Sequence, residues 1–318
     1  MDRNLALEVV RVAEAAALSS ARWMGRGNEQ LAEQTAVDAM RRAFDAVEFA
    51  GTVVIGRGEK EETPTLYVGE KVGAGIGPEV DVAAEPLEGP SIVAAGRTNA
   101  LSAVALAEKG CLFPAPDTYM EKIAVGPKAL GAIDITAGPE ANLRSIAETM
   151  KCYVEDLTVA VLDRPRHVDL IQVFREMGVR IKLIQDGDLS AAIATALEDS
   201  GIDVLMGIGR APEGVLAAAA LRCLGGDMQA QFRPSSEEDV ARIRRTGLKE
   251  AERVLTITDL AKGSDVTFTA TGVTDGDFLK GVRFFGGGAK THSLVMRSKS
   301  GTARFIEAIH RFDRNPIY

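Results

Sequence analysis

Aromatic residues are scarce in this sequence: they make up 5% of its 318 residues, and there is one tryptophan. The core must therefore rely on alanine, valine, leucine and isoleucine. Basic residues are also in deficit, because 37 Lys and Arg residues face 45 Asp and Glu residues, which gives a formal net charge of −8. Such a charge argues against DNA or RNA as the main partner. A local cluster of arginines could still bind a small anionic substrate.

Cysteines and long apolar runs are few as well. The cysteines, Cys111, Cys152 and Cys223, are odd in number and widely spaced, so they predict neither a disulfide framework nor a zinc motif. We expect them to be small buried hydrophobic residues. Charged residues interrupt the first 24 positions, which is not typical of a signal peptide, and no apolar stretch is long enough to span a bilayer. We therefore expect a cytoplasmic protein without a membrane partner.

The composition that remains is typical of a globular protein, with 46% apolar and 26% charged residues. Two amphipathic helices joined by a turn at residues 25–28 are predicted by apolar residues at helical spacing, at Leu5, Val9, Val12 and Ala16 and again at Val37, Met40, Phe44 and Val47. The β-branched run between Gly51 and Gly56 predicts a strand. Further strands are expected to join the same sheet, at residues 66–68, 80–84, 100–107 and 123–125.

Regular alternation of strands and helices begins near Lys151. Strands are predicted at 157–162, 179–184 and 204–208, and helices at 168–177, 190–197 and 213–224. Such alternation indicates a parallel sheet with right-handed crossovers. We therefore expect an α/β protein with a boundary near Lys151, which divides it into two halves, residues 1–150 and residues 151–318.

Each of the three strands in the second half leads into a polar loop. The loops are residues 163–167 (Asp-Arg-Pro-Arg-His), 186–188 (Asp-Gly-Asp) and 207–214 (Gly-Ile-Gly-Arg-Ala-Pro-Glu-Gly). Ligands bind at the carboxyl ends of the strands of open parallel sheets, where neighbouring loops lie side by side. A single polar residue there is more often a solvated loop residue, but three converging loops favour a binding site.

The side chains of these loops suit a sugar phosphate. Arg164, Arg166 and Arg210 can each bind a phosphate through two parallel hydrogen bonds. Asp186 and Asp188 can accept hydrogen bonds from sugar hydroxyls. The pattern therefore predicts a site for a small phosphorylated molecule.

Acidic side chains are the second recurring feature. Two loops of the first half carry them, residues 56–59 (Gly-Arg-Gly-Glu) and 85–89 (Glu-Pro-Leu-Glu-Gly). Carboxylates a few residues apart on such turns commonly hold Mg²⁺ or Mn²⁺ beside a phosphate. Glu213, at the start of a predicted helix, could ligate a cation or complement the helix dipole. The alternative to a metal ligand, for each of these carboxylates, is a solvated side chain on a charged surface turn. His167 lies near the predicted site, but we do not expect it to be catalytic.

The motifs of the sequence together resemble one family over nearly the whole chain, the class II fructose-1,6-bisphosphatases. That family includes a form that also acts on sedoheptulose 1,7-bisphosphate. The resemblance is carried by residues 51–56 (Gly-Thr-Val-Val-Ile-Gly), 66–73 (Leu-Tyr-Val-Gly-Glu-Lys-Val-Gly), 115–117 (Ala-Pro-Asp) with 119–120 (Tyr-Met), and 281–285 (Gly-Val-Arg-Phe-Phe). The three strand-end loops complete it.

This resemblance implies a layered α/β/α/β/α sandwich of the metal-dependent, lithium-sensitive sugar phosphatase type. It also implies a homodimer or homotetramer that hydrolyses the 1-phosphate of fructose 1,6-bisphosphate with water activated by Mn²⁺ or Mg²⁺. Sedoheptulose 1,7-bisphosphate is a candidate second substrate. The implied catalytic residues are Glu33, Glu59 and Glu85, and the implied metal ligands are Glu33, Glu85, Glu88 and Glu213. The implied substrate-binding residues are Glu88, Gly89, Tyr119, Arg164, Pro165, Arg166, Asp186, Gly187, Asp188 and Arg210.

Several of these positions depart from the family pattern. Glu33 and Glu85 stand where the family has aspartate, which moves the carboxylate oxygens outward by one methylene. Arg57 stands where the family has glutamate, so it reverses the local charge and favours one bound ion over two. Pro90 replaces threonine and has neither its hydroxyl nor a backbone N–H to offer. The side chain at position 210 also differs from that of the family.

Two hypotheses follow from these departures. In the first, the chain is an active sugar bisphosphatase in which Glu33, Glu85, Glu88 and Glu213 hold one cation and Arg57 stands in for a second charge. In the second, it is a paralogue that binds a sugar phosphate without efficient hydrolysis and acts as a sensor or partner subunit. The preserved sugar-phosphate residues lead us to predict the phosphatase.

Overall fold

The computed structural model describes residues 4–60 and 63–314. The chain divides into two compact units. The first unit comprises Met1–Leu112 and Gly263–Tyr318, and the second comprises Phe113–Lys262. The division differs from the boundary that we predicted near Lys151, because the last strands of the chain return to the sheet that the first strands begin. Each unit contains one sheet and its own helices, so the predicted α/β class is confirmed.

The first unit is built on an eight-stranded sheet of order β12-β13-β11-β4-β3-β1-β2, in which β14 pairs with β13. Most neighbours are antiparallel, and β1 with β3 is a parallel pair. The strands are β1 (Ala50–Ile55), β2 (Lys71–Val72), β3 (Glu79–Glu88), β4 (Leu101–Glu108), β11 (Thr267–Gly272), β12 (Arg283–Phe285), β13 (Gly288–Arg297) and β14 (Thr302–Arg311).

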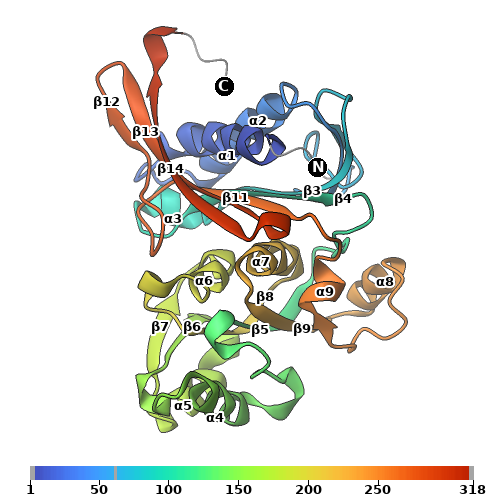
Figure 1. Ribbon diagram of the computed structural model, residues 1–318, viewed down its shortest axis with the longest axis vertical. Coiled ribbons are helices and arrows are strands. Elements are labelled where there is room, and N and C mark those ends of the chain that lie inside the picture. Colours follow the sequence, from blue (N-terminus) through green and yellow to red (C-terminus); the bar gives the residue numbers. More distant parts are fainter. Residues whose placement is uncertain (1–3, 61–62, 315–318) are drawn as a thin grey trace. The chain divides into compact units, whose positions relative to one another are not determined.

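Two helices cover one face of this sheet, as Figure 1 shows. α1 (Leu5–Ala21) packs along β3, β4, β11 and β13, and α2 (Glu29–Phe44) packs on α1 and β3. Their apolar stripes enter a core of small and aliphatic residues, to which Phe44 and Phe49 add the edge-to-face ring pair. Both predicted helices and the predicted strand after Gly51 are confirmed. A third helix, α3 (Pro90–Ala95), begins directly after Gly89.

The second unit is built on a six-stranded sheet of order β10-β9-β5-β8-β6-β7. β7, β6 and β8 are parallel to one another, as the alternation predicted. The pairs β8–β5, β5–β9 and β9–β10 are antiparallel. The strands are β5 (Tyr119–Val125), β6 (Thr158–Leu162), β7 (Arg180–Ile184), β8 (Val204–Arg210), β9 (Asp227–Phe232) and β10 (Leu255–Thr256).

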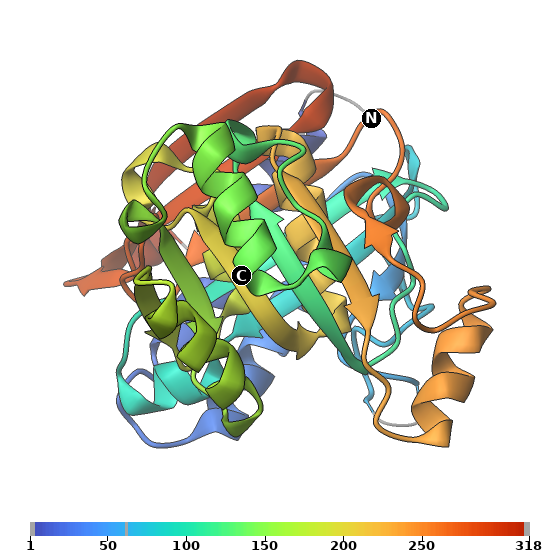
Figure 2. The same cartoon turned by 90° about the horizontal axis from the view of Figure 1, so that it is seen from below.

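Helices lie on both faces of this second sheet. Figures 1 and 2 show α4 and α5 on one face and α6 and α7 on the other. The helices are α4 (Pro139–Met150), α5 (Val168–Glu176), α6 (Asp188–Ala194), α7 (Ala211–Leu224), α8 (Glu237–Arg245) and α9 (Ile257–Leu260). Phe174, Leu143 and Ile146 pack with the sheet in one continuous core. The predicted helices at 168–177, 190–197 and 213–224 are confirmed within a few residues.

Two sequence-based expectations about elements are wrong, and the one about buried cysteines holds for one cysteine of three. Residues 66–68 form a turn instead of a strand, because Leu66 has a positive φ of 53° and its N–H donates to the Glu70 carboxylate. Residues 123–125 belong to β5, which pairs with β8 and β9 in the second sheet. Of the cysteines, Cys223 is buried, but Cys111 and Cys152 are only partly so.

The sequence predicts no stretch that spans a bilayer. Within residues 4–60 and 63–314, no helix combines the length and the apolar character that crossing a bilayer requires.

Candidate active site

The three polar loops of the second unit meet at the carboxyl ends of β6, β7 and β8. The Asp163 N–H donates to the carbonyl oxygen of Ile184 at 2.7 Å. The Arg166 guanidinium donates from Nε and Nη2 to the carbonyl oxygen of Ile208, at 3.1 and 2.9 Å. The predicted adjacency of these loops is therefore confirmed.

An exposed group of one aromatic ring and two guanidiniums stands over this sheet edge. The Arg166 guanidinium lies 5.1 Å from the centre of the Tyr119 ring, an arrangement that permits a cation–π interaction. Tyr119 is directly opposite Arg210 in the register of β5 and β8. Arg210 Nη2 lies 2.9 Å from Asp117 Oδ1. Arg164 is half-buried and donates to its neighbour, the Asp163 carbonyl oxygen. Two positive groups therefore face solvent beside a ring that a sugar can pack against.

Asp188 supplies a buried carboxylate to the same loops. It begins α6, and Gly187 before it has a φ of 84°, a left-handed conformation that favours glycine. Asp188 is 4% exposed and forms an ion pair with Lys122 of β5. Its other oxygen, Oδ1, has no hydrogen-bond partner among the described residues. Asp186 is half-buried, and its Oδ1 accepts from the Gly187 N–H at 3.2 Å. A buried acceptor that protein groups leave unused is suited to a ligand hydroxyl.

His167 holds two of the loops together. Its ring is 1% exposed, its Nδ1 lies 2.7 Å from the Leu162 carbonyl oxygen, and its Nε2 accepts from the Ile208 N–H at 2.8 Å. Burial lowers the pKa of His167, so the ring is neutral with its proton on Nδ1. Both ring nitrogens are thus engaged with the backbone, which is a structural role.

Lys122 is the residue of this site that sequence reasoning missed. It is 2% exposed, although it is a lysine. A signal was present, because Lys122 alternates with Met120 and Ala124 along the buried face of β5. A lysine on the apolar face of a strand is almost never buried without a charged partner.

Glu213 lies at the start of the next helix. It is half-buried in the first turn of α7, two residues after Ala211 opens that helix. A carboxylate in this position is favourably placed with respect to the helix dipole. The structure therefore supports the helix-start position that we predicted for Glu213.

In the first unit, Arg57 forms an ion pair with Glu33. Glu33 lies on α2 and Arg57 follows β1, and both side chains are about one quarter exposed, at 27% and 24%. The two positions that depart from the family pattern thus form an ion pair with each other. Glu59, further along the same loop, is exposed.

The other carboxylates of the first unit lie on β3. Glu85 is half-buried and Glu88 is 3% exposed. The pairing of β3 with β4 shifts between them, so that Glu85 is opposite Ala103 and Glu88 is opposite Leu101. Such an irregularity re-aims the side chains of a strand. Gly89 follows with a φ of 82°, and Pro90 opens α3.

Comparison with known proteins shows which family the chain belongs to. The family described as bacterial fructose-1,6-bisphosphatase, glpX-encoded, matches residues 3–310. The chain belongs to this family. Two cyanobacterial relatives, from Synechococcus sp. (strain JA-3-3Ab) and Crocosphaera subtropica (strain ATCC 51142 / BH68), carry the name D-fructose 1,6-bisphosphatase class 2/sedoheptulose 1,7-bisphosphatase. Each is 45% identical to this chain, over 337 and 334 residues, and each alignment covers 98% of this chain and 97% of the relative.

The family is one of sugar bisphosphatases, which are phosphoric monoester hydrolases, and it is metal-dependent. Within the described residues, no three His, Cys, Asp or Glu side chains are grouped to hold a metal ion. Of the four predicted ligands, Glu33, Glu85 and Glu88 belong to the first unit and Glu213 to the second. Glu33 forms its ion pair with Arg57. The predicted ligand set therefore stays a prediction.

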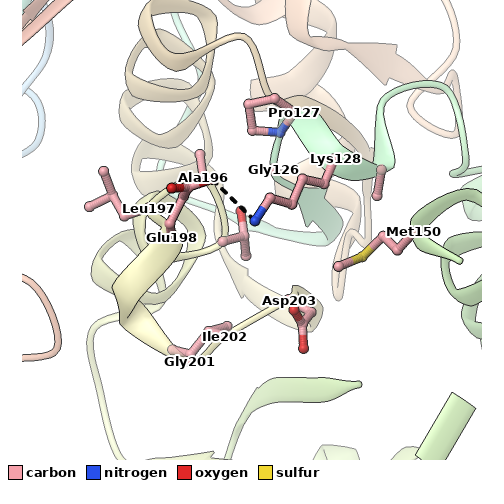
Figure 3. Close-up of a pocket in the computed structure, with 12 residues that line it drawn as sticks. Gly126, Pro127, Lys128, Met150, Ala196, Leu197, Glu198, Gly201, Ile202 and Asp203 are labelled. Carbon is pink, nitrogen blue, oxygen red and sulfur yellow. Dashed lines mark ion pairs between the residues drawn. The ribbon is translucent and has the colours of Figure 1, made fainter. Parts of the chain in front are cut away.

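A separate cavity of about 170 Å³ lies elsewhere in the second unit of this bisphosphatase (Figure 3). Lys128 and Glu198, whose charged groups lie 3.2 Å apart, are among its lining residues, with Met150 and Asp203. Asp203 directly precedes β8, whereas Arg210 ends that strand. The cavity is thus at the opposite end of the strand from the three polar loops, and it contains none of the predicted site residues.

Proposed function

We propose that this protein hydrolyses the 1-phosphate of fructose 1,6-bisphosphate, with sedoheptulose 1,7-bisphosphate as a candidate second substrate. The observation that carries the proposal is the convergence of the Tyr119–Arg166 pair, Arg210 and the buried Asp188 at one sheet edge of a family member. Sugar bisphosphates combine two phosphates with several hydroxyls. The guanidiniums suit the phosphates, and the carboxylates suit the hydroxyls.

In this proposal the second unit binds the sugar phosphate. Arg164, Arg166 and Arg210 contact phosphate, while Asp186 and Asp188 accept hydrogen bonds from hydroxyls. Pro165 and Gly187 belong to the two loops that carry these side chains, and Gly187 starts α6 through its left-handed conformation. Tyr119 is 44% exposed and offers its ring to the sugar.

The first unit contributes the carboxylates. We propose that Glu33, Glu59 and Glu85 act in catalysis and that Glu88 and Gly89 contact substrate. Glu33, Glu85, Glu88 and Glu213 are the proposed ligands of one Mn²⁺ or Mg²⁺, which when bound supplies an activated water. Arg57 would replace the positive charge of a second ion. The Arg57–Glu33 ion pair supports this role, because the guanidinium already sits against a carboxylate.

The same ion pair also favours a second candidate function. If Arg57 withdraws Glu33 from the metal, and Pro90 lacks the donor that threonine would offer, the chain could bind sugar phosphate without hydrolysing it. It would then act as a sensor or a partner subunit. In both cases we propose a homodimer or homotetramer, which is what the family resemblance implies, and a cytoplasmic location, which the sequence pattern favours.

Phosphate release from fructose 1,6-bisphosphate, measured across separate Mn²⁺ and Mg²⁺ titrations, tests the proposal. We expect metal-dependent turnover by the unaltered protein. A variant with Arg57→Glu and Pro90→Thr is compared with it, and Arg11→Glu, at an exposed position of α1, controls for charge reversal.

The outcomes of this comparison separate the two candidates. Turnover by the unaltered protein establishes the phosphatase. No turnover, together with activity gained by the Arg57→Glu/Pro90→Thr variant and sugar-phosphate binding by both proteins, would identify the non-hydrolysing paralogue instead.

A further inference from the structure

The buried Lys122–Asp188 ion pair is the strongest unassigned feature of the site. The side chains of Lys122 and Asp188 are 2% and 3% exposed. Burial of an ammonium and a carboxylate is costly, and the cost is offset only where each finds charged or hydrogen-bonding partners. Lys122 has two such partners, because its Nζ contacts Asp188 and also donates to the carbonyl oxygen of Arg210 at 3.0 Å.

Glycines on both sides leave room for this pair. A Cβ at Gly209 would overlap Asp188 Oδ2 and lie 2.8 Å from Lys122 Nζ. A Cβ at Gly214 would lie 2.7 Å from Met120 Sδ and 3.4 Å from Lys122 Cδ. Neither glycine has a φ in the left-handed region, so their backbone conformations do not require glycine. At Gly209 the reason for glycine is the space that Lys122 and Asp188 occupy, whereas at Gly214 it is mainly the space that Met120 occupies.

The pair also determines which Asp188 oxygen is available. Oδ2 faces Lys122, whereas Oδ1 is buried and has no hydrogen-bond partner among the described residues. The same ammonium holds the backbone of Arg210, the residue that caps α7. One side chain of β5 therefore connects the loop that carries Asp188 with the loop that carries Arg210.

We propose that Lys122 is a positioning residue for the sugar-phosphate site. It compensates the charge of Asp188 and leaves Oδ1 as the acceptor for a sugar hydroxyl. Through the Arg210 carbonyl, it also keeps that arginine at the phosphate. Lys122 acts through these two residues and does not itself contact the substrate. The inference rests on the proposed function, because it concerns the same site.

Calorimetric titration with fructose 6-phosphate tests this role without requiring hydrolysis. Lys122→Met, which keeps the length of the side chain but removes the charge, should weaken binding roughly 10- to 100-fold. Asp188→Asn should weaken it as well. The double variant Lys122→Met/Asp188→Asn should bind more weakly than Asp188→Asn, because the contact with the Arg210 carbonyl is also lost, but its loss should be smaller than the sum of the two single losses, because the lysine acts in part through that carboxylate. Lys128→Met removes an exposed lysine of the same unit and should leave binding unchanged.

Kinetics distinguish positioning from a general loss of structure. With fructose 1,6-bisphosphate, Lys122→Met should raise KM by a similar factor and change kcat by less than about threefold, because uniform binding is lost. Gly209→Ala is the second variant, in case Lys122→Met does not fold. Its methyl group separates the pair while both charges remain, and we expect the same rise in KM.

Each outcome decides the question. Unchanged fructose 6-phosphate affinity in a folded Lys122→Met or Gly209→Ala variant would overturn the inference and leave the proposed function intact. Additive losses in the double variant would also overturn it. If the unaltered protein fails to bind fructose 6-phosphate, the proposed function and this role of Lys122 are both wrong.

Discussion

At the scale of single residues, Asp265 and Arg297 form a buried ion pair with two parallel hydrogen bonds in the first unit. Asp265 Oδ1 and Oδ2 accept from Arg297 Nε and Nη2 at 2.7 and 2.6 Å, and the Asp265 side chain is 1% exposed. These hydrogen bonds hold the pKa of Asp265 at about 2. Folding therefore favours the ionised form, so the pair stabilises the protein at neutral pH. We expect this stabilisation to disappear as the pH falls from about 4 towards 2.

Urea denaturation of the unaltered protein and Asp265→Asn at neutral and acidic pH measures this effect. The variant should lose roughly 3 kcal/mol of unfolding free energy at about pH 7, because it leaves Arg297 uncompensated, and much less at about pH 2.5. Glu79→Gln, which breaks an exposed pair with Lys109, should cost less than about 1 kcal/mol at either pH. An Asp265→Asn loss that does not change with pH would show that the ion pair is not its source.

Single residues also show how far sequence reasoning reaches into the site. Arg166 and Asp188 could be predicted, because they follow strands of a recognisable pattern and match family motifs. The alternation along β5 marks Lys122 as a buried lysine, but its partner could not be predicted, since Asp188 lies on a helix whose position depends on the order of β5, β8 and β6 in the sheet. The same holds for the Arg57–Glu33 pair: the reversed charge could be predicted, but not its partner on α2.

At the scale of elements, α2 depends on one capping residue. The Asn28 side chain accepts from the Leu31 N–H at 2.9 Å, which satisfies a donor at the start of the helix that carries Glu33. Asn28→Ala should lower the unfolding free energy by about 1 kcal/mol. Asn28→Asp keeps the acceptor and adds a charge that the helix dipole favours, so it should cost nothing. Thermal unfolding of the two variants checks this, and equal stability would contradict the capping role.

Elements with their own apolar pattern were predictable, and their partners were not. The strand–helix alternation from β6 to α7 was correct, because each element buries its own periodic face. β5 was assigned to the wrong sheet, since a short apolar strand carries no information about its neighbours. α3 was missed because its six residues follow a left-handed glycine and begin with proline, which together resemble a loop.

At the scale of the whole molecule, the second unit is an insertion in the first. Its sheet pairs only strands from within 113–262, and it has its own core. The chain leaves and returns at neighbouring positions, because a Cβ at Gly263 would lie 2.9 Å from Cys111 Sγ. We expect the fragment 113–262 to fold alone and to bind fructose 6-phosphate more weakly than the full chain. Near-ultraviolet circular dichroism and calorimetry measure this, and an unfolded fragment would contradict the division.

The insertion was not predictable from local patterns. The composition of the chain does not change at residue 112 or at residue 263, and the predicted boundary near Lys151 followed the onset of regular alternation instead. Which strands close a sheet is decided by long-range packing. Here β11, from the end of the chain, pairs with β4, from its first third.

The position of β11 beside β4 has a consequence for biosynthesis. Seven of the eight residues of β4 are buried in the finished sheet, yet on one side its hydrogen-bonding partner is β11. The ribosome must therefore make the whole inserted segment before that edge can close, a delay of roughly 10–30 s at typical elongation rates. During this interval the nascent chain presents an apolar, unpaired strand, the kind of surface that chaperones protect from aggregation. All strands of the inserted unit (113–262) are synthesised before β11 emerges. The second unit can therefore be complete while the first unit, whose synthesis began earlier, still lacks its last strands.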